Sequence, residues 1–271
     1  VIVDFIFEKA AWCRHLCPLG GMAGLFSMSS MIEIRSNRNV CNTICTTHDC
    51  YKGSEKAGPC PMFLHLQFLS DNRNCKVCLN CIKNCTHNAT RLNLRIPGAE
   101  ISSLRQPTLA GALFSIILSG LLLAEILSRS SVGQASFPLV FSASICFALI
   151  LNLLSNSSTA LTSKETIIEH IKHFGYTLLP LTLFGFMARK AIDVFGNVEG
   201  SLMLFNTYKL NFNFTSAFQL LFVLTGLFIT EYLIYKIIQN KITKDKQSLV
   251  FVIQGIVPLI IAVIYIMLFF T

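Results

Sequence analysis

The sequence has few charged residues. Asp, Glu, Lys and Arg make up 13% of its 271 residues, whereas soluble domains contain about 25%. Hydrophobic residues make up 53%, so a soluble globular enzyme is not expected. The sequence also shows no nucleophile–base pair and no glycine-rich phosphate-binding loop. A hydrolase or an ATP-driven activity therefore has no support.

Histidine is scarce in the second half of the chain. Residues 109–271 contain only His170 and His173, which are three residues apart and would share one helix face. A membrane b-type haem is usually held by two histidines from facing helices. The sequence therefore excludes such a haem within this region, and we expect both residues to be surface histidines at the edge of a membrane span.

Long apolar runs dominate the same half. A helix that crosses a bilayer needs about 20 mostly apolar residues, and five stretches approach this length: 109–128, 137–154, 173–189, 216–237 and 249–270. The third contains Pro180, which a bundle tolerates or which marks a break in the helix. Residues 155–166, rich in Ser, Thr and Asn, predict a polar loop. We expect a mainly α fold in which residues 109–271 form a transmembrane helical domain of about five spans.

The excess of basic residues predicts an orientation. The formal net charge is +8, but the basic residues lie between apolar runs, so no nucleic-acid partner is expected. With five spans, 18 Lys and Arg lie on the side of residues 1–108 and 4 on the other. Basic loops face the cytoplasm, where thiols stay reduced. The sequence predicts a multi-pass protein of the inner (cytoplasmic) membrane with its cysteine-rich region on the cytoplasmic side.

Ten of the 11 cysteines lie between Cys13 and Cys85. Four of them follow the spacing C-x2-C-x2-C-x3-C, namely Cys75, Cys78, Cys81 and Cys85. This is the bacterial ferredoxin run for a [4Fe–4S] cluster, in which the fourth cysteine binds iron of a second cluster. Zinc is the alternative, but structural zinc sites usually combine two separated C-x2-C pairs.

A second, stretched motif lies upstream. Cys41, Cys45 and Cys50 are followed by Cys60-Pro61, and Cys-Pro is a ferredoxin ending. Residues 41–98 therefore predict a ferredoxin-like domain with two [4Fe–4S] clusters. In two-cluster ferredoxins the last cysteine of each motif binds the cluster of the other motif, which we call the crossover rule. This rule assigns Cys41, Cys45, Cys50 and Cys85 to cluster one, and Cys75, Cys78, Cys81 and Cys60 to cluster two. The irregular first spacing leaves open that some upstream cysteines are free thiols or bind a different metal.

Cys13 and Cys17 form a third motif, C-x3-C-P. On a helix the two thiols would share one face. They could be a redox-active dithiol, a metal site with His15, substitute cluster ligands, or two structural cysteines. The apolar start at Val1 looks like the tail of an earlier helix. We therefore expect residues 1–40 to contain the end of a preceding membrane segment followed by this pair.

The order of these motifs resembles a known family. Residues 12–20 read Trp-Cys-Arg-His-Leu-Cys-Pro-Leu-Gly and precede both cluster motifs. Across residues 11–98 the chain resembles the membrane-bound polyferredoxins, which include NapH-type quinol dehydrogenase subunits, NosR-type electron donors and iron–sulfur proteins of cytochrome oxidase assembly. The resemblance implies two [4Fe–4S] clusters and electron transfer between the quinone pool and a redox protein partner.

We therefore expect a membrane-anchored electron carrier, or a quinol-dehydrogenase-type subunit, rather than a stand-alone enzyme. The alternative is a redox-sensing or metal-handling assembly factor that uses Cys13 and Cys17. A quinone could bind polar residues of the spans, which also serve to bridge helices: Tyr176, Gln219 and Gln254. Glu125 and Glu231 are proton-relay candidates or solvated charges at helix ends. The sequence defines neither the donor, the acceptor, the direction of electron flow, the cluster potentials nor the oligomeric state.

Overall fold

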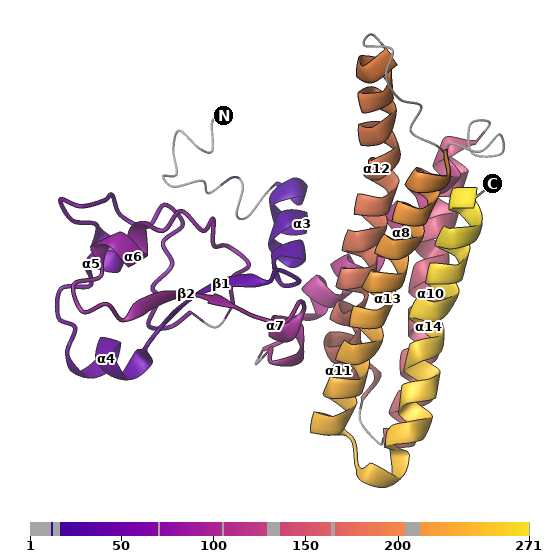
Figure 1. Ribbon diagram of the computed structural model, residues 1–271. Helices are drawn as coiled ribbons and strands as arrows, with labels where there is room; N and C mark the ends of the chain where they lie inside the picture. The colour runs from indigo at the N-terminus through magenta and orange to yellow at the C-terminus, as the bar shows by residue number, and fades with distance from the viewer. Residues whose placement is uncertain are drawn as a thin grey trace. The chain divides into compact units, whose positions relative to one another are not determined.

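A computed structural model describes residues 12, 17–69, 71–104, 106–128, 136–163, 166–203 and 212–270. These residues are mainly helical, as the sequence predicted. The chain divides into two compact units, residues 1–105 and residues 106–271, which we call the N-terminal unit and the helical unit (Figure 1).

Short helices and one pair of strands build the N-terminal unit. Its elements are α3 (Pro18–Ser27), β1 (Ile32–Ser36), α4 (Arg38–Thr43), α5 (Asp49–Lys52), α6 (Asn80–Asn84), β2 (Thr90–Leu94) and α7 (Ala99–Ser102). The strands pair antiparallel, with Ile34 opposite Leu92. Because all eight cysteines of the two cluster motifs lie between β1 and β2 in the sequence, this pairing closes the cysteine-bearing segment into one unit.

Helix α3 contacts the segment that leads to Cys75. Pro18 is the first residue of the helix, a position at which a proline costs no hydrogen bond. Cys17 precedes it as the N-cap residue, with an extended backbone. A Cβ on Gly24 would lie 3.1 Å from the Arg73 carbonyl oxygen, so only glycine allows this close approach without a shift. The Ser27 hydroxyl donates to the Asn72 carbonyl at 3.4 Å.

Long helices form the other unit. Its elements are α8 (Leu109–Leu127), α10 (Phe137–Ser163), α11 (Ile167–Phe174), the 3₁₀ helix η1 (Gly175–Leu178), α12 (Leu179–Met203), α13 (Phe212–Lys241), the 3₁₀ helix η2 (Lys244–Lys246) and α14 (Gln247–Phe270). The long helices α8, α10, α12, α13 and α14 pack side by side (Figure 1).

Close packing and buried hydrogen bonds join these helices. A Cβ on Gly120 of α8 would lie 2.8 Å from the Ile145 Cα of α10, because small residues let membrane helices approach. The Tyr265 hydroxyl of α14 donates to the Ser119 carbonyl of α8 at 2.8 Å. The Gln219 amide of α13 donates to the Ala188 carbonyl of α12 at 3.2 Å. Each bond satisfies a polar group that would find no hydrogen-bond partner in the lipid.

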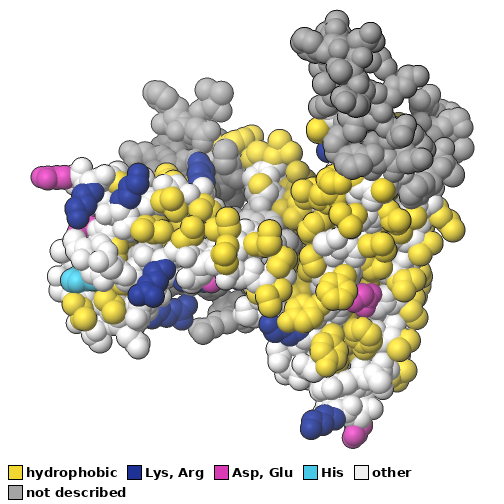
Figure 2. Space-filling model, viewed as in Figure 1, with side chains coloured by type: hydrophobic (Ala, Val, Ile, Leu, Met, Phe, Trp, Pro, Cys, Tyr) yellow, Lys and Arg dark blue, Asp and Glu magenta, His cyan; other side chains and the backbone are white. Residues whose placement is uncertain are grey.

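Four helices in the described part of the chain are long and apolar enough to cross a membrane: α8, α10, α13 and α14. Figure 2 shows hydrophobic side chains covering much of the visible face of the helical unit. Exposed large hydrophobic residues lie on α10, α13 and α14. An apolar surface of this kind faces lipid in a membrane protein. The helical unit is therefore the membrane part of the chain.

The third predicted span differs from the structure. Residues 173–189 are not one helix, because they comprise the end of α11, the 3₁₀ helix η1 and the first part of α12. Pro180 is the second residue of α12, where a proline is tolerated. Helix α12 is not among the four candidate spans. It contains Arg189, Lys190 and Asp193, which lower its hydropathy, although it packs along α8 and α13.

The predicted polar loop at 155–166 is also wrong for most of its length. Helix α10 continues to Ser163, and the hydroxyls of Ser157 and Ser158 donate to carbonyls four residues earlier, at 2.7 Å and 2.9 Å. Bonds of this type satisfy polar side chains within a helix. Asn156 is buried and accepts a bond from Gln254 of α14. Tertiary contact therefore extends the helix.

Candidate functional site

Four cysteines line one concave space in the N-terminal unit, which we call site one. They are Cys41, Cys45, Cys50 and Cys85. The space measures about 300 Å³ out to open solvent and is also lined by Asp49, His87 and Thr90. Three of the cysteines come from the first motif, and Cys85 comes from the second.

Four other cysteines line a second space, which we call site two. They are Cys60, Cys75, Cys78 and Cys81. This space measures about 380 Å³ out to open solvent, and its wall includes Ile34, Met62 and Leu66, all of which are buried. Here Cys60 comes from the first motif and the other three from the second. The structure thus brings the eight cysteines together in the two sets that the crossover rule names.

The third cysteine of each motif occupies the same local position. Cys50 is the second residue of α5, and the preceding His48 is a left-handed N-cap with φ of 55°. Cys81 is the second residue of α6, and Leu79 is a left-handed N-cap with φ of 65°. Left-handed non-glycine residues are uncommon and cluster where the surroundings impose them. Each motif therefore makes one such turn and sets a cysteine in the first turn of a short helix.

The loop of site two turns a backbone donor toward sulfur. Val77 has a φ of 51°, which is rare for a β-branched residue. Its N–H donates to the Cys75 Sγ at 3.5 Å. The Cys75 N–H in turn donates to the Asn72 carbonyl at 2.9 Å. The strained turn thus places a hydrogen-bond donor on a cysteine sulfur. Burial raises the pKa of Cys75, and the hydrogen bond from Val77 offsets part of that rise.

The pKa values of two thiols are raised by burial and by the charges of neighbouring cysteines. At site one, burial and then the charges of Cys45, Cys85 and Cys41 raise the pKa of Cys50 to about 11. At site two, burial and then the charges of Cys75, Cys78 and Cys60 raise the pKa of Cys81 to about 12. In the metal-free protein these thiols therefore hold their protons at neutral pH, and cations that bind there must displace them.

Cys85 differs from these thiols. Burial raises its pKa, but hydrogen bonds from the Thr90 side chain and from the Ala89 and Thr90 backbone outweigh burial and lower it. The Ala89 N–H lies 3.2 Å from the Cys85 Sγ. The start of β2 thus stabilises the thiolate of the cysteine that joins the two motifs.

Asn84 is a site residue that sequence reasoning missed. Its side chain is 1% exposed, and its amide nitrogen donates to the carbonyls of Ala57 and Gly58 at 3.0 Å and 3.1 Å. Its oxygen accepts a bond from the Ser54 hydroxyl at 2.8 Å. Asn84 therefore ties the segment before Cys60 to the residue before Cys85. In the sequence, only its position next to a cysteine points to Asn84. The exposed Lys76 also lies next to a cysteine, so that position does not distinguish Asn84.

No three His, Cys, Asp or Glu side chains in the described residues lie close enough to hold a single metal ion. In a tetrahedral zinc site the Zn–S bonds are about 2.3 Å, which brings the sulfurs within about 4 Å of one another. Four thiols that line one concave space are the type of donor set that iron–sulfur clusters use.

The remaining cysteines are Cys13, Cys17 and Cys146. Cys17 does not line either space. Cys13 lies outside the described residues, so the geometry of the Cys13/Cys17 pair is not defined. Cys146 is exposed on α10.

Most of the polar residues singled out in the spans are engaged within the bundle. The Tyr176 hydroxyl contacts the Thr108 side chain at 3.0 Å, and the Gln254 amide donates to the Thr159 hydroxyl at 3.0 Å. Glu125 pairs with Lys190 at 3.2 Å. Glu231 differs, because its buried Oε1 has no partner among the described residues.

The two histidines of the helical unit have different surroundings. The prediction that both are surface residues is wrong for His170, which is 1% exposed and bonds to the Ser163 hydroxyl at 2.6 Å. His173 lies 2.6 Å from the Lys241 Nζ. Folding α11 against the end of α10 buries His170 because its polar ring finds hydroxyl partners there.

Comparison with known proteins finds relatives over part of the chain. "Putative electron transport protein YccM" of Escherichia coli (strain K12) is 29% identical over 129 residues, which cover 46% of this chain and 33% of that protein. "Ferredoxin-type protein NapH" of Haemophilus influenzae is 27% identical over 99 residues, which cover 35% of this chain and 33% of that protein. "Uncharacterized protein MJ0750" of Methanocaldococcus jannaschii is 28% identical over 83 residues, 31% of each.

The matched regions span about a third of the length of these relatives. No family model matches the chain, and no solved structure matches it. The names of two relatives, an electron transport protein and a ferredoxin-type protein, confirm the resemblance to the membrane-bound polyferredoxins.

Proposed function

We propose that this relative of the membrane-bound polyferredoxins is a membrane-anchored electron carrier with one [4Fe–4S] cluster at each four-cysteine site. The observation that supports this most directly is the division of eight cysteines into two sets of four. Each set takes one cysteine from the other motif, which is the ligand pattern of two-cluster ferredoxins.

The chemistry of the donor set fits this cofactor. Thiolates are the usual ligands of iron–sulfur clusters, and each site offers four cysteines around one concave space. A cluster would supply a one-electron redox centre at each site. The buried apolar wall of site two would exclude water, while the N–H of Val77 would stabilise a thiolate ligand.

The two sites are close enough for one to influence the other. Burial is the main cause that raises the pKa of Cys81, at site two, and the charge of Cys50, at site one, adds the smallest contribution. Helices α5 and α6 carry these two cysteines and pack against each other. An electron could therefore pass between the sites within one compact unit, without motion of the chain.

We further propose that the N-terminal unit faces the cytoplasm and that α12 crosses the membrane as a fifth span. The distribution of Lys and Arg supports both proposals, as does the packing of α12 along α8 and α13. An epitope inserted between residues 129 and 135 should then be accessible from outside the inner membrane. Accessibility only after the membrane is broken would contradict the orientation.

The electron partner in the membrane would be a quinone or a membrane protein. A small apolar space lies among α8, α10 and α14, measures about 210 Å³ out to the open surface, and includes Ser119, Phe147 and Tyr265 in its wall. Anaerobic addition of a reduced short-chain quinone to the purified protein should reduce the clusters if quinone is the donor. Reduction by a redox protein alone would assign the role to a protein partner.

Iron and sulfide analysis of anaerobically purified protein tests the central proposal. Two [4Fe–4S] clusters require about eight irons and about eight sulfides per chain, with visible absorbance that dithionite bleaches and an EPR signal of the reduced clusters. Cys78→Ser should remove a ligand at site two and lower the iron content to about four. Cys146→Ser is the matched control, since both cysteines are exposed, and it should keep all the iron.

Two results would contradict the proposal. One is a colourless wild-type protein that contains zinc and no sulfide. The other is a Cys78→Ser protein with the same iron content as the Cys146→Ser control.

A further inference from the structure

The two strands of the N-terminal unit alternate between apolar and polar residues. Strand β1 reads Ile-Glu-Ile-Arg-Ser, and β2 with the two residues after it reads Thr-Arg-Leu-Asn-Leu-Arg-Ile. The pairing continues past β2, because the Arg95 N–H donates to the Met31 carbonyl at 2.8 Å. Successive side chains of a strand point to opposite faces, and residues directly opposite in an antiparallel pair share a face. The two-stranded ribbon therefore has an apolar face and a polar face.

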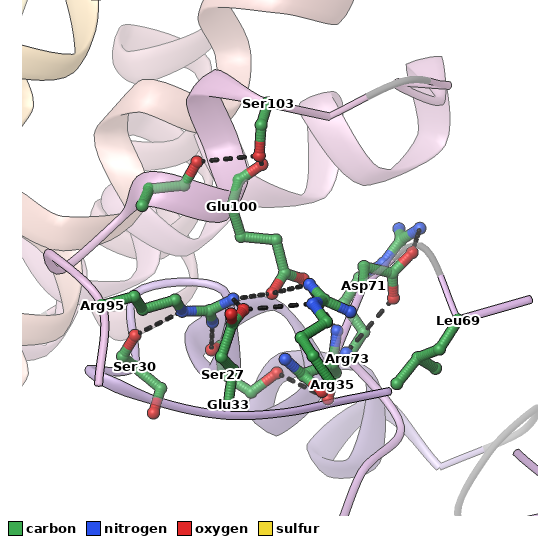
Figure 3. Close-up of polar contacts among 12 residues, drawn as sticks. Ser27, Ser30, Glu33, Arg35, Leu69, Asp71, Arg73, Arg95, Glu100 and Ser103 are labelled. Carbon is green, nitrogen blue, oxygen red and sulfur yellow. Dashed lines mark hydrogen bonds and ion pairs between the residues drawn. The ribbon is translucent and has the colours of Figure 1, made fainter. Parts of the chain in front are cut away.

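Ion pairs hold the polar face within the unit. Arg95 pairs with Glu33 at 3.1 Å and more closely with Glu100 of α7, and Arg35 lies 3.2 Å from Glu33 (Figure 3). The Glu100 side chain is 2% exposed. Arg95 also donates to the Ser27 carbonyl at the end of α3, at 3.1 Å. The polar face is therefore fixed to α3 and α7.

The apolar face is largely open in the part of the chain that the structure describes. Ile34 is 1% exposed and lines site two together with Met62 and Leu66. The other apolar residues of this face have exposed fractions from 42% to 84%: Ile32, Leu92, Leu94 and Ile96. Apolar residues that alternate along a strand are typical of a face that is removed from water. The structure thus covers this face at Ile34 and leaves its other residues exposed.

The composition of the open face fits lipid better than a protein partner. Its four exposed residues are all aliphatic, and none is charged or aromatic. Protein interfaces are enriched in Tyr, Trp and Arg, which supply most of the binding energy at hot spots. Lipid tails require apolar contact alone, and contiguous exposed apolar residues mark membrane contact sites as well as protein ones.

The bilayer is also within reach of this face. Ile96 lies 13 residues before Leu109, the first residue of the candidate span α8, and 13 residues extend to about 45 Å at most. A short tether keeps a binding surface at a high effective concentration near its target. Even weak affinity of the apolar face for lipid would therefore keep it bound.

We propose that the face formed by Ile32, Leu92, Leu94 and Ile96 binds the surface of the lipid bilayer. The edges of a two-stranded ribbon carry unpaired backbone groups, which hydrocarbon cannot satisfy. The strands therefore lie at the level of the lipid headgroups, and the four side chains reach the start of the acyl chains. This inference goes beyond the proposed function, because lipid binding by the ribbon needs no redox chemistry. Since Ile34 of the same face lines site two, binding would also bring site two close to the membrane surface.

Tryptophan fluorescence tests the proposal, because bromine on a lipid quenches a tryptophan that it contacts. The full-length protein, with Trp12→Phe to remove its single tryptophan, is reconstituted in phosphatidylcholine–phosphatidylglycerol vesicles with or without bromine near the headgroup. Leu94→Trp should lose most of its emission in the brominated vesicles. Asn93→Trp is the matched control, because Asn93 is the neighbouring exposed residue on the opposite face, and it should keep most of its emission.

A second pair of variants separates lipid binding from a local effect of one substitution. Leu92→Trp should be quenched as Leu94→Trp is. Adding Leu94→Asp to Leu92→Trp should restore its emission, because a charged side chain is costly in lipid. Each variant is compared with itself in the two kinds of vesicle, so quenching by any bound cluster cancels, and its iron content is measured to detect misfolding.

The outcomes separate the possible occupants of the face. Quenching of Leu92→Trp and Leu94→Trp without quenching of Asn93→Trp supports lipid binding. Equal quenching of all three variants overturns it. Emission that responds to acrylamide but not to bromine shows that the face meets water, and emission that responds to neither shows that protein covers it, as in a dimer; both results overturn the inference. Wild-type protein without iron and sulfide contradicts the proposed function alone.

Discussion

Asn84→Ala should make both four-cysteine sites release iron faster. The substitution removes three side-chain hydrogen bonds, two to the carbonyls of Ala57 and Gly58 and one from Ser54. These bonds join α6 to the segment that precedes Cys60. Without them, that segment should separate more often from the residue before Cys85.

The structure allows an estimate of the size of this effect. Each bond contributes about 1 kcal/mol net, and water can replace part of it because Ser54 and Gly58 are exposed, which leaves a cost of about 2 to 3 kcal/mol. Since 1.4 kcal/mol corresponds to a tenfold change in population, the opened segment should become about 30- to 140-fold more populated. If opening limits iron loss, the rate should rise by the same factor.

Loss of visible absorbance in the presence of an iron chelator, followed anaerobically, measures this rate. Asn93→Ala is the control, because Asn93 is exposed on β2, and it should behave as the wild type. Asn84→Asp keeps the acceptor for Ser54 but loses both donated bonds and places a carboxylate in the wall of site one, so it should release iron at least as fast. Iron release from Asn84→Ala at the rate of the Asn93→Ala control would refute the reasoning.

Three further predictions follow from the same geometry. Cys17→Ser should leave the iron content unchanged, because Cys17 lines neither site; a loss of about four irons would instead make it a ligand. In the metal-free protein, burial raises the pKa of Cys50 to about 11 and of Cys81 to about 12. The free energy of unfolding should therefore be unchanged below pH 9 and fall as the pH rises through 11 and 12. Chemical denaturation at several pH values measures the direction of this change. Gly120→Ala should destabilise the helical unit by about 1 to 3 kcal/mol, because its Cβ would meet Ile145 and Ser144; thermal aggregation in detergent should show a lower midpoint, and an unchanged one would contradict the packing.

The cysteine motifs could be found from the sequence because their spacing is local. Cys75, Cys78 and Cys81 lie within seven residues, and a tight turn can bring such neighbours together in any surrounding fold. The membrane helices could be found for a similar reason, since the bilayer requires about 20 apolar residues in one run. The run at 216–237, for example, lies entirely within α13.

Other features depended on contacts between distant residues. The polar stretch after residue 154 looks like a loop, but Gln254, about 100 residues later, gives Asn156 a partner and the helix continues. His170 is buried because Ser163 of α10 bonds to its ring. Neither partner can be identified from the local sequence.

The sequence by itself determined that this is a mainly helical membrane protein with two cysteine motifs, because residue type and short-range spacing are enough to define both. Only the tertiary structure decided that Asn84 ties the two motifs together and that Arg35, Arg95, Glu33 and Glu100 form one network of ion pairs. Such polar partners come from separate strands, helices and loops. They can be identified only when folding removes water from them and leaves each dependent on the others.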